Sequence, residues 1–195
     1  IFLYAFQIVA LNENNFKENY IKYDVSSITK LNLNELMEIT KELLSNLKGS
    51  TNQSYLKKYF NEKEMLHLKD VRRLFEIGFT FKYIAMTLLL ISTVYLLIKS
   101  PNIIRKIINY SVLIVFIVFG VLILLISVDF NKYFTYFHVI LFNNELWLLN
   151  PNTDLMIQMM PEPLFINLFV KIILLFFSLM SIIVMVVNIK KMRVN

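Results

Sequence analysis

The sequence predicts an all-α integral membrane protein with four transmembrane helices, the first truncated at its start, and two extracytoplasmic segments that form a helical cap. Hydrophobic residues make up 57% of the 195 residues and the mean hydropathy is +0.59, whereas soluble domains have about 45–50% apolar residues. Three predominantly apolar runs, Phe79–Ile98, Ile107–Val128 and Leu164–Ile189, reach the length of about 20 residues that a spanning helix needs.

The distribution of charge sets the expected orientation. The formal net charge is +6, and segments 99–106 and 190–195 contain Lys and Arg but no acid. Basic residues beside apolar runs mark cytoplasmic loops. The excess positive charge therefore indicates membrane topology, and no nucleic-acid partner is expected. Without Cys, and with this hydrophobicity, a disulfide-stapled secreted fold and a disordered chain are both excluded.

The elements follow in order from these two patterns. The sequence starts with an apolar stretch without Met, which we interpret as the outer part of a first helix whose beginning is missing; a signal-peptide remnant is the alternative. The expected organisation is 1–12 outer part of the first transmembrane helix, 13–77 extracytoplasmic helical segment, 78–98 second transmembrane helix, 99–106 cytoplasmic loop, 107–128 third transmembrane helix, 129–163 extracytoplasmic aromatic cap, 164–189 fourth transmembrane helix and 190–195 cytoplasmic tail. Both termini are thus expected in the cytoplasm.

The first extracytoplasmic segment has helical signals of its own. Apolar residues recur at helical spacing from Leu33 to Leu47, and Gly49 stands where a C-terminal cap belongs. We expect this helix to lie along the lipid headgroups. Asn61, followed by Glu62 and Glu64, is typical of the start of a second helix, which should continue into the membrane.

The second extracytoplasmic segment is dense in aromatic residues, as is typical of a membrane interface. The sequence 150–153 is a turn signal. Asp154 is expected to open a short helix that ends before Pro161. This segment is expected to cover the helix bundle.

The two histidines of the chain, His67 and His138, lie one in each extracytoplasmic segment. Taken alone, His67 is typical of a buried residue satisfied by Asp70 one turn on, and His138 of an interfacial residue with a solvated tip. Brought to one surface, they form a candidate acid–base pair, because imidazole accepts and donates protons near neutral pH. We expect His138 to be the main base and His67 its partner.

Other chemistries have weaker support. A metal site would recruit Asp70, Asp154 or Glu145, but no H-E-x-x-H spacing occurs, and no metal or other cofactor is expected. There is no Cys and no G-x-S-x-G motif, so no protein nucleophile is evident. Lys171 lies inside the last span. It is either a functional residue or one whose long side chain extends to the outer membrane surface, and the sequence leaves both open.

Two motifs resemble a known family. Glu64-x-x-His67-Leu68-x-Asp70-Val71-Arg72 and, from His138 to Glu162, H-x-x-L-F-x-N-x-x-W-x-L-x-P-x-x-D-x-x-I-x-x-x-P-E are similar to the lipoprotein intramolecular transacylases of Gram-positive bacteria. The order of apolar and polar segments also matches that family over nearly the whole chain. The missing start of the first span is the main departure.

The resemblance implies a reaction and a partner. Family members move the sn-2 acyl chain of a diacylglyceryl lipoprotein onto the free amino group of its N-terminal Cys, which gives a lyso-form lipoprotein. It also implies that both histidines, His67 and His138, are in the active site, at the extracytoplasmic surface of a bacterial cell membrane and in contact with membrane lipid. The remaining site candidates are the oxyanion donors Arg72, Arg73, Asn143, Asn144 and Trp147 and the imidazole-orienting acids Asp70 and Asp154.

Two alternatives from other classes remain. A metal-dependent membrane hydrolase would bind a transition metal in its active form. A non-catalytic scaffold would tolerate loss of both histidines, and a transporter would need polar residues along its spans, of which Ile107–Val128 has few.

Overall fold

A computed structural model describes residues 1–50 and 52–192. The described residues form helices joined by short loops, and no β-strand occurs among them. In chain order the elements are α1 (Phe2–Ala10), α2 (Glu13–Lys22), α3 (Val25–Thr29), α4 (Leu33–Leu47), η1 (Leu56–Lys58), α5 (Glu62–Lys99), α6 (Pro101–Val128), α7 (Phe130–Leu141), α8 (Leu155–Met159) and α9 (Glu162–Met192).

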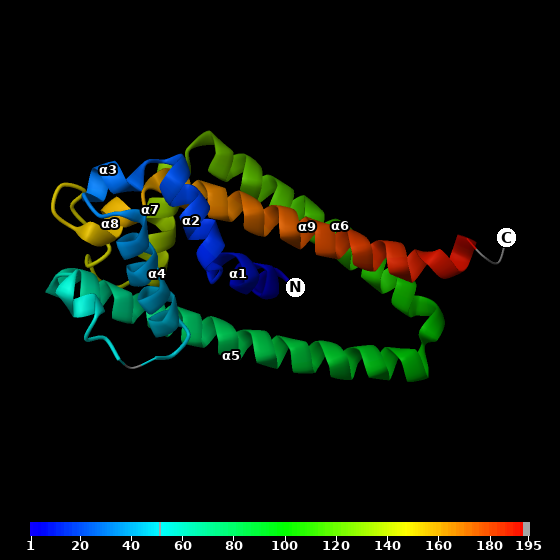
Figure 1. Ribbon diagram of the computed structural model, residues 1–195. Coiled ribbons are helices and arrows are strands. Elements are labelled where there is room, and N and C mark those ends of the chain that lie inside the picture. The colour runs from blue at the N-terminus through cyan, green and yellow to red at the C-terminus, as the bar shows by residue number, and fades with distance from the viewer. Residues whose placement is uncertain (51, 193–195) are drawn as a thin grey trace.

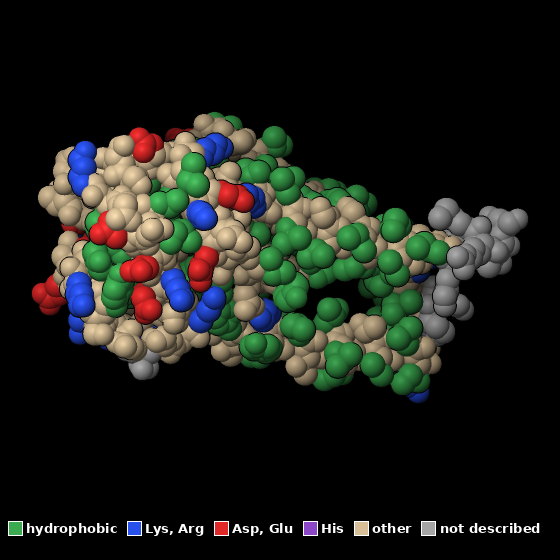
Figure 2. Space-filling model, viewed as in Figure 1, with side chains coloured by type: hydrophobic (Ala, Val, Ile, Leu, Met, Phe, Trp, Pro, Cys, Tyr) green, Lys and Arg blue, Asp and Glu red, His purple; other side chains and the backbone are tan. Residues whose placement is uncertain are grey.

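Three long helices dominate the molecule (Figure 1). α5, α6 and α9 each contain a stretch long and apolar enough to cross a membrane. The shorter helices α2, α3, α4, α7 and α8 gather at one end of the long ones, and we call this the short-helix region. In Figure 2 the charged side chains concentrate over this region, while hydrophobic side chains cover the long helices. The protein is therefore an all-helical membrane protein.

The first predicted span is represented by α1, which has 9 residues and is not among the helices long enough to cross. It packs on α9 and α5. Ala5 is fully buried, and the Phe2 ring lies 5.6 Å from that of Phe176 on α9. Three of the four predicted spans thus correspond to long helices.

The predicted cytoplasmic loop 99–106 is shorter in the structure. α5 continues through Lys99 and α6 begins at Pro101, so Ser100 alone joins the two helices. Proline suits the first position of a helix because its φ is already helical and it has no N–H to satisfy. The predicted tail 190–195 is likewise helical as far as Met192, and 193–195 lie outside the described residues.

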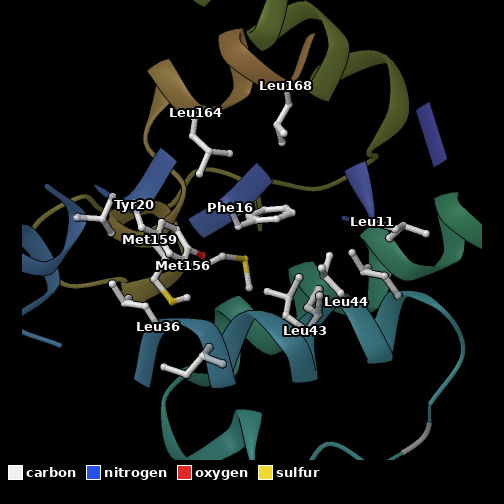
Figure 3. Close-up of a cluster of buried hydrophobic side chains, with 14 of the residues drawn as sticks. Leu11, Phe16, Tyr20, Leu36, Leu43, Leu44, Met156, Met159, Leu164 and Leu168 are labelled. Carbon is white, nitrogen blue, oxygen red and sulfur yellow. The ribbon is translucent and has the colours of Figure 1, made fainter. Parts of the chain in front are cut away.

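The helix expected from Leu33 to Leu47 is confirmed as α4. Asn32 and Glu35 form a reciprocal capping box at its start, and Gly49 follows its end with a φ of +115°, a conformation that favours glycine. The apolar face of α4 is buried rather than exposed. Leu36 and Leu44 pack with Tyr20 of α2, Met159 of α8 and Leu164 of α9 (Figure 3).

The second segment folds as α7 followed by α8. Most of the aromatic residues lie on α7, whose helical spacing was not predicted. α8 begins after Asp154 and ends before Pro161, as expected. Because α8 packs in the same core as α2 and α4, the two predicted extracytoplasmic segments meet in the short-helix region.

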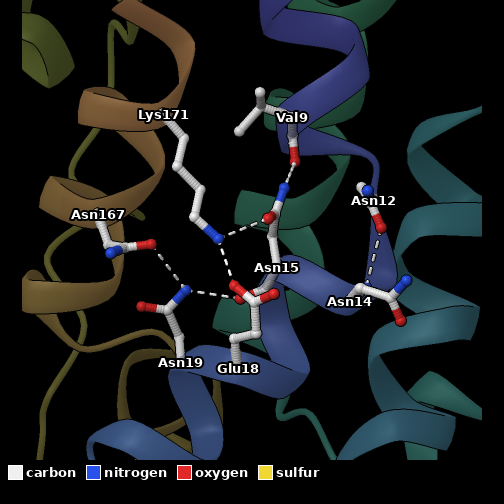
Figure 4. Close-up of polar contacts among 8 residues, drawn as sticks. All are labelled: Val9, Asn12, Asn14, Asn15, Glu18, Asn19, Asn167 and Lys171. Atoms are coloured by element: carbon white, nitrogen blue, oxygen red, sulfur yellow. Dashed lines mark hydrogen bonds and ion pairs between the residues drawn. The ribbon is translucent and has the colours of Figure 1, made fainter. Parts of the chain in front are cut away.

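A polar network ties α2 to α9 (Figure 4). The Lys171 ammonium of α9 donates to Asn15 Oδ1 at 2.8 Å and forms an ion pair with Glu18. Asn19 donates to Asn167 Oδ1 at 3.2 Å. Lys171 is therefore accounted for by partners on α2, which supports a structural role.

Lys82, on α5, is also buried. Its ammonium donates to Gln7 on α1 and lies 4.6 Å from the centre of the Tyr83 ring. An intramembrane cation needs such a partner because lipid cannot solvate it.

Candidate active site

The structure brings His67 and His138 together. The two rings, one from the second turn of α5 and one from the last turn of α7, have centroids 6.3 Å apart. Both side chains are buried, with 7% and 8% of their surface exposed. Two residues remote in sequence thus share one site.

The length of α5 explains the position of this site relative to the apolar runs. A helix of 38 residues is about 57 Å long, well beyond the about 30 Å of a bilayer's hydrocarbon core. The apolar run starts at Phe79, so residues 62–78 extend past it and carry His67 into the short-helix region.

Aromatic side chains enclose the pair. The Phe142 ring lies 5.3 Å from His67 and 5.6 Å from His138, in contact with both. The His138 ring is also close to the rings of Phe134 at 4.4 Å, Trp147 at 4.9 Å and Phe137 at 5.4 Å. These apolar walls keep water away from the imidazoles.

One hydrogen bond sets the tautomer of His138. Its Nδ1 lies 2.7 Å from the backbone carbonyl oxygen of Phe134. A carbonyl only accepts, so Nδ1 carries the proton and the lone pair of the neutral ring is on Nε2. His138 is therefore held ready to accept a proton at Nε2.

His67 lacks the partner that the sequence suggested. Its Nδ1 is buried and has no hydrogen-bond partner within the described part of the chain. Asp70, expected to satisfy or orient it, instead accepts a hydrogen bond from Asn144 at 2.9 Å. The interpretation of His67 as a histidine satisfied one turn on is wrong, because a residue from the α7–α8 loop takes that carboxylate.

Burial holds both imidazoles neutral. Desolvation lowers the pKa of His67 to about 4, with a further lowering from His138 and a smaller opposing effect of Asp70. Desolvation also lowers the pKa of His138, against the hydrogen bond to Phe134. At neutral pH both rings are thus uncharged and able to accept a proton.

A groove of about 340 Å³ lies beside the histidines. Its lining includes Asp70, Arg73, Asn143 and Asn144, together with Phe142, which contacts both imidazoles. Four predicted candidates therefore line one cavity, and Trp147 stacks on His138 with an interplanar angle of 28°.

Two other candidates lie elsewhere. Arg72 donates to the backbone carbonyls of Ser50 at 2.6 Å and Gly49 at 3.0 Å and pairs with Glu76 at 2.9 Å. In the structure its guanidinium thus holds the chain that follows α4 and does not line the groove beside the histidines.

Asp154 is also not an imidazole-orienting acid. It accepts hydrogen bonds from Asn61 at 3.0 Å, from Thr153 at 3.0 Å and from the Asn150 N–H at 2.8 Å. These bonds lower the pKa of its carboxyl, that from Asn150 most. Asp154 joins the start of α5 to the turn before α8.

A buried acid near the site was missed as a functional residue. Glu64, 1% exposed, accepts the backbone N–H of Met156 at 2.6 Å and that of Asn61 at 2.7 Å. Lys63 adds a bond to the Leu148 carbonyl at 2.6 Å. The first turn of α5 therefore holds 148–156 in place, one turn before His67. The capping pattern from Asn61 was visible in the sequence, but the contact across the fold was not.

A cluster of three or more His, Asp or Glu side chains able to hold a metal ion does not occur in 1–50 or 52–192. The chemistry that these residues can supply is proton transfer by two neutral imidazoles in a dry, aromatic setting.

Comparison with known proteins places this geometry in context. The family model for the lipoprotein intramolecular transacylase Lit matches residues 1–165. A structure of the membrane-integral lipoprotein intramolecular transacylase Lit from Bacillus cereus is similar, with a TM-score of 0.86 and 23% identity over 100% of this chain and 91% of that one. A variant of the same protein with one histidine replaced by alanine has a TM-score of 0.83 and 21% identity, over 100% and 89%. No curated protein matches the sequence.

Proposed function

The chain belongs to the lipoprotein intramolecular transacylase family, and we propose that it transfers the sn-2 acyl chain of a diacylglyceryl lipoprotein to the amino group of the same molecule's N-terminal Cys. The observation that carries the proposal is the buried pair of imidazoles, 6.3 Å apart and enclosed by aromatic rings. Donor and acceptor are in one molecule, so the protein needs no nucleophile of its own.

The reaction balances with the two histidines alone. The neutral amine attacks the ester carbonyl carbon and forms the C–N bond, while His138 Nε2 takes a proton from that nitrogen. The resulting imidazolium returns the proton to the glyceryl sn-2 oxygen as the C–O bond breaks. The products are an amide and a free hydroxyl, with no net change in protons.

His67 has a different part in this mechanism. Its lowered pKa keeps the ring neutral, with one N–H and one lone pair. In the proposed mechanism this N–H donates to the oxyanion of the tetrahedral intermediate. Holding amine and ester together contributes as well, since well-oriented intramolecular reactions gain about 7–11 kcal/mol from proximity.

The location of the site fits a lipid-anchored substrate. We place the short-helix region on the extracytoplasmic side of a bacterial cell membrane, because Lys99, Arg105 and Lys106 lie at the opposite end of the long helices. The C-terminus then lies in the cytoplasm. In this position the histidines meet the substrate where its acyl chains enter the lipid.

The direct test is expression in a bacterial host that makes only diacylglyceryl lipoproteins, followed by mass spectrometry of the N-terminal lipopeptides. The expected product has the mass of the substrate, with one acyl chain moved from glycerol to nitrogen. His67→Ala and His138→Ala should each abolish it while the protein still inserts, and Leu66→Ala, an exposed neighbour, should not. Near-normal conversion by either histidine variant would remove that residue from the mechanism.

A further inference from the structure

A second groove continues from the one at the histidines. It is a shallow, open hollow of about 370 Å³, and all its lining residues lie on one face of α5: Arg73, Glu76, Ile77, Thr80, Phe81 and Ile84. Arg73 and Ile77 line both grooves, so the two adjoin along α5. We call the groove next to the histidines the upper groove and the second one the lower groove.

The two grooves differ in chemistry. The upper groove has Asp70, Asn143 and Asn144 in its wall and touches the histidine site through Phe142. The lower groove is mainly apolar and follows one face of α5 into the apolar run that begins at Phe79. From Arg73 to Ile84 it covers about 16 Å of helix. A ligand occupying both would be polar at one end and apolar at the other.

We propose that the lower groove holds the migrating sn-2 acyl chain of the substrate, an assignment that rests on the proposed function. The carbonyl carbon of this chain must lie at the imidazoles, and the chain continues directly from that atom. The upper groove then receives the ester and amine, and the apolar path past Ile77 leads the chain along α5. The second acyl chain, attached at another glycerol carbon, remains in the lipid.

Arg73 lies at the junction of the two grooves, where the acyl chain leaves the ester site of the upper groove. Its guanidinium can donate to an ester carbonyl oxygen at this level. The lower groove and the upper groove are thus joined by a residue that can bind the polar ester group at their boundary.

The test fills the lower groove and measures chain-length preference. Ile77→Trp and Thr80→Trp each place an indole in its wall, and both positions are exposed, so the fold should tolerate the change. Met86→Trp is the matched control, because Met86 is equally exposed on α5 and lines neither groove. The substrates are synthetic diacylglyceryl lipopeptides with a palmitoyl or an octanoyl chain at sn-2, and a second series with the same change at sn-1.

For both groove variants we expect the octanoyl-to-palmitoyl rate ratio in the sn-2 series to rise about tenfold, since losing the contact of even one methylene of the longer chain with an apolar site costs about that factor. The sn-1 series and Met86→Trp should keep the ratio of the unchanged protein. An unchanged ratio in the sn-2 series, or a shift that follows sn-1, overturns the assignment. Failure of the unchanged protein to convert any substrate would instead overturn the proposed function.

Discussion

Protonation of His67 costs folding free energy, because its ring is buried and its Nδ1 has no partner among the residues described. The pKa of His67 is about 4 in the folded protein, against about 6.5 in an unfolded chain. The unfolded state therefore binds more protons between these values. The contribution of neutral His67 to the free energy of unfolding is therefore fully present above pH 6.5 and declines as the pH falls toward 4.

The first prediction follows from this shift. Lowering the pH from 6.5 to 4 should cost the detergent-solubilised protein up to about 3 kcal/mol through His67 alone. In His67→Gln the fall in the unfolding midpoint over that range should be clearly smaller, whereas Lys69→Gln, at an exposed neighbour, should behave like the unchanged protein. Equal pH dependence in all three would contradict the assignment.

The stack of Trp147 on His138 gives a second prediction. The indole lies 4.9 Å from the imidazole and limits how the ring can tilt about its hydrogen bond to Phe134. Aromatic pairs contribute about 0.5–1.5 kcal/mol, so Trp147→Ala should lower the rate of acyl transfer by up to about tenfold. Trp147→Phe, which can still stack, should retain most of the rate. Similar losses in both variants would point to the indole N–H rather than the stack.

At this scale the sequence identified the histidines but not their partners. Their residue type, and the presence of one histidine in each predicted extracytoplasmic segment, were sufficient to select His67 and His138. The i, i+3 relation also brought Asp70 near His67, but the hydrogen bond of Asp70 goes to Asn144, 74 positions away. Helix geometry predicts neighbours on one helix and gives no information on which distant side chain competes for them.

Among the elements, α5 has two functions in one helix: its apolar part is a candidate span, and its first turns carry His67 and hold residues 148–156. Glu64 is central to the second function. Burial raises the pKa of its carboxyl, against the bonds from Met156 and Asn61. Its removal would leave the Met156 N–H without an acceptor.

The third prediction concerns this contact. Glu64→Ala should destabilise the protein by about 2 kcal/mol, because bonds to charged acceptors contribute about 1.5–3 kcal/mol. It should also lower activity, since the segment 148–156 follows Trp147, which stacks on His138. Glu62→Ala is the control, as it removes the same side chain from the same turn at an exposed position. Thermal unfolding of the two variants in detergent measures the difference, and equal midpoints would contradict the role of Glu64.

The helices α2 and α7 were not predicted from the sequence, and the reason differs between them. α2 turns Asn15 and Asn19 inward, where they bond to Val9 and Asn167 on neighbouring elements, so an apolar periodicity is missing. On α7 the aromatic residues do share one face, opposite Asn131, Lys132 and Thr135, so its helical spacing was present in the sequence but was interpreted only as an aromatic interface. α4 and α8, with an apolar stripe and clear end signals, were predicted.

For the whole molecule, the connection between the short-helix region and the long helices is partly electrostatic. Lys171 on α9 pairs with Glu18 and Asn15 on α2, near the end of a candidate span that meets the short-helix region. The side chains are 32% and 65% exposed, so solvent or headgroups weaken the attraction. Composition indicated the membrane class and the long helices, but this pairing depends on the tertiary fold.

The fourth prediction uses a double-mutant cycle. Lys171→Met and Glu18→Gln should each destabilise the protein, and the double variant should lose less than the sum, with a coupling of about 1 kcal/mol. Unfolding midpoints in detergent at low and high salt give the values. The coupling should decrease with salt. Additive losses would show that Lys171 acts through Asn15 alone.

The unbroken course of α5 makes the site responsive to the lipid around it. Transmembrane helices adapt to bilayer thickness by tilting, and α5 is one continuous helix whose arm beyond the apolar run carries one of the two imidazoles. From the middle of the apolar run to His67 the arm is about 30 Å, so a change in tilt of about 5° moves the ring by about 3 Å. Conversion rates measured in vesicles of short-chain and long-chain lipids should therefore differ, with membrane thickness itself adjusting the spacing of the reactive pair.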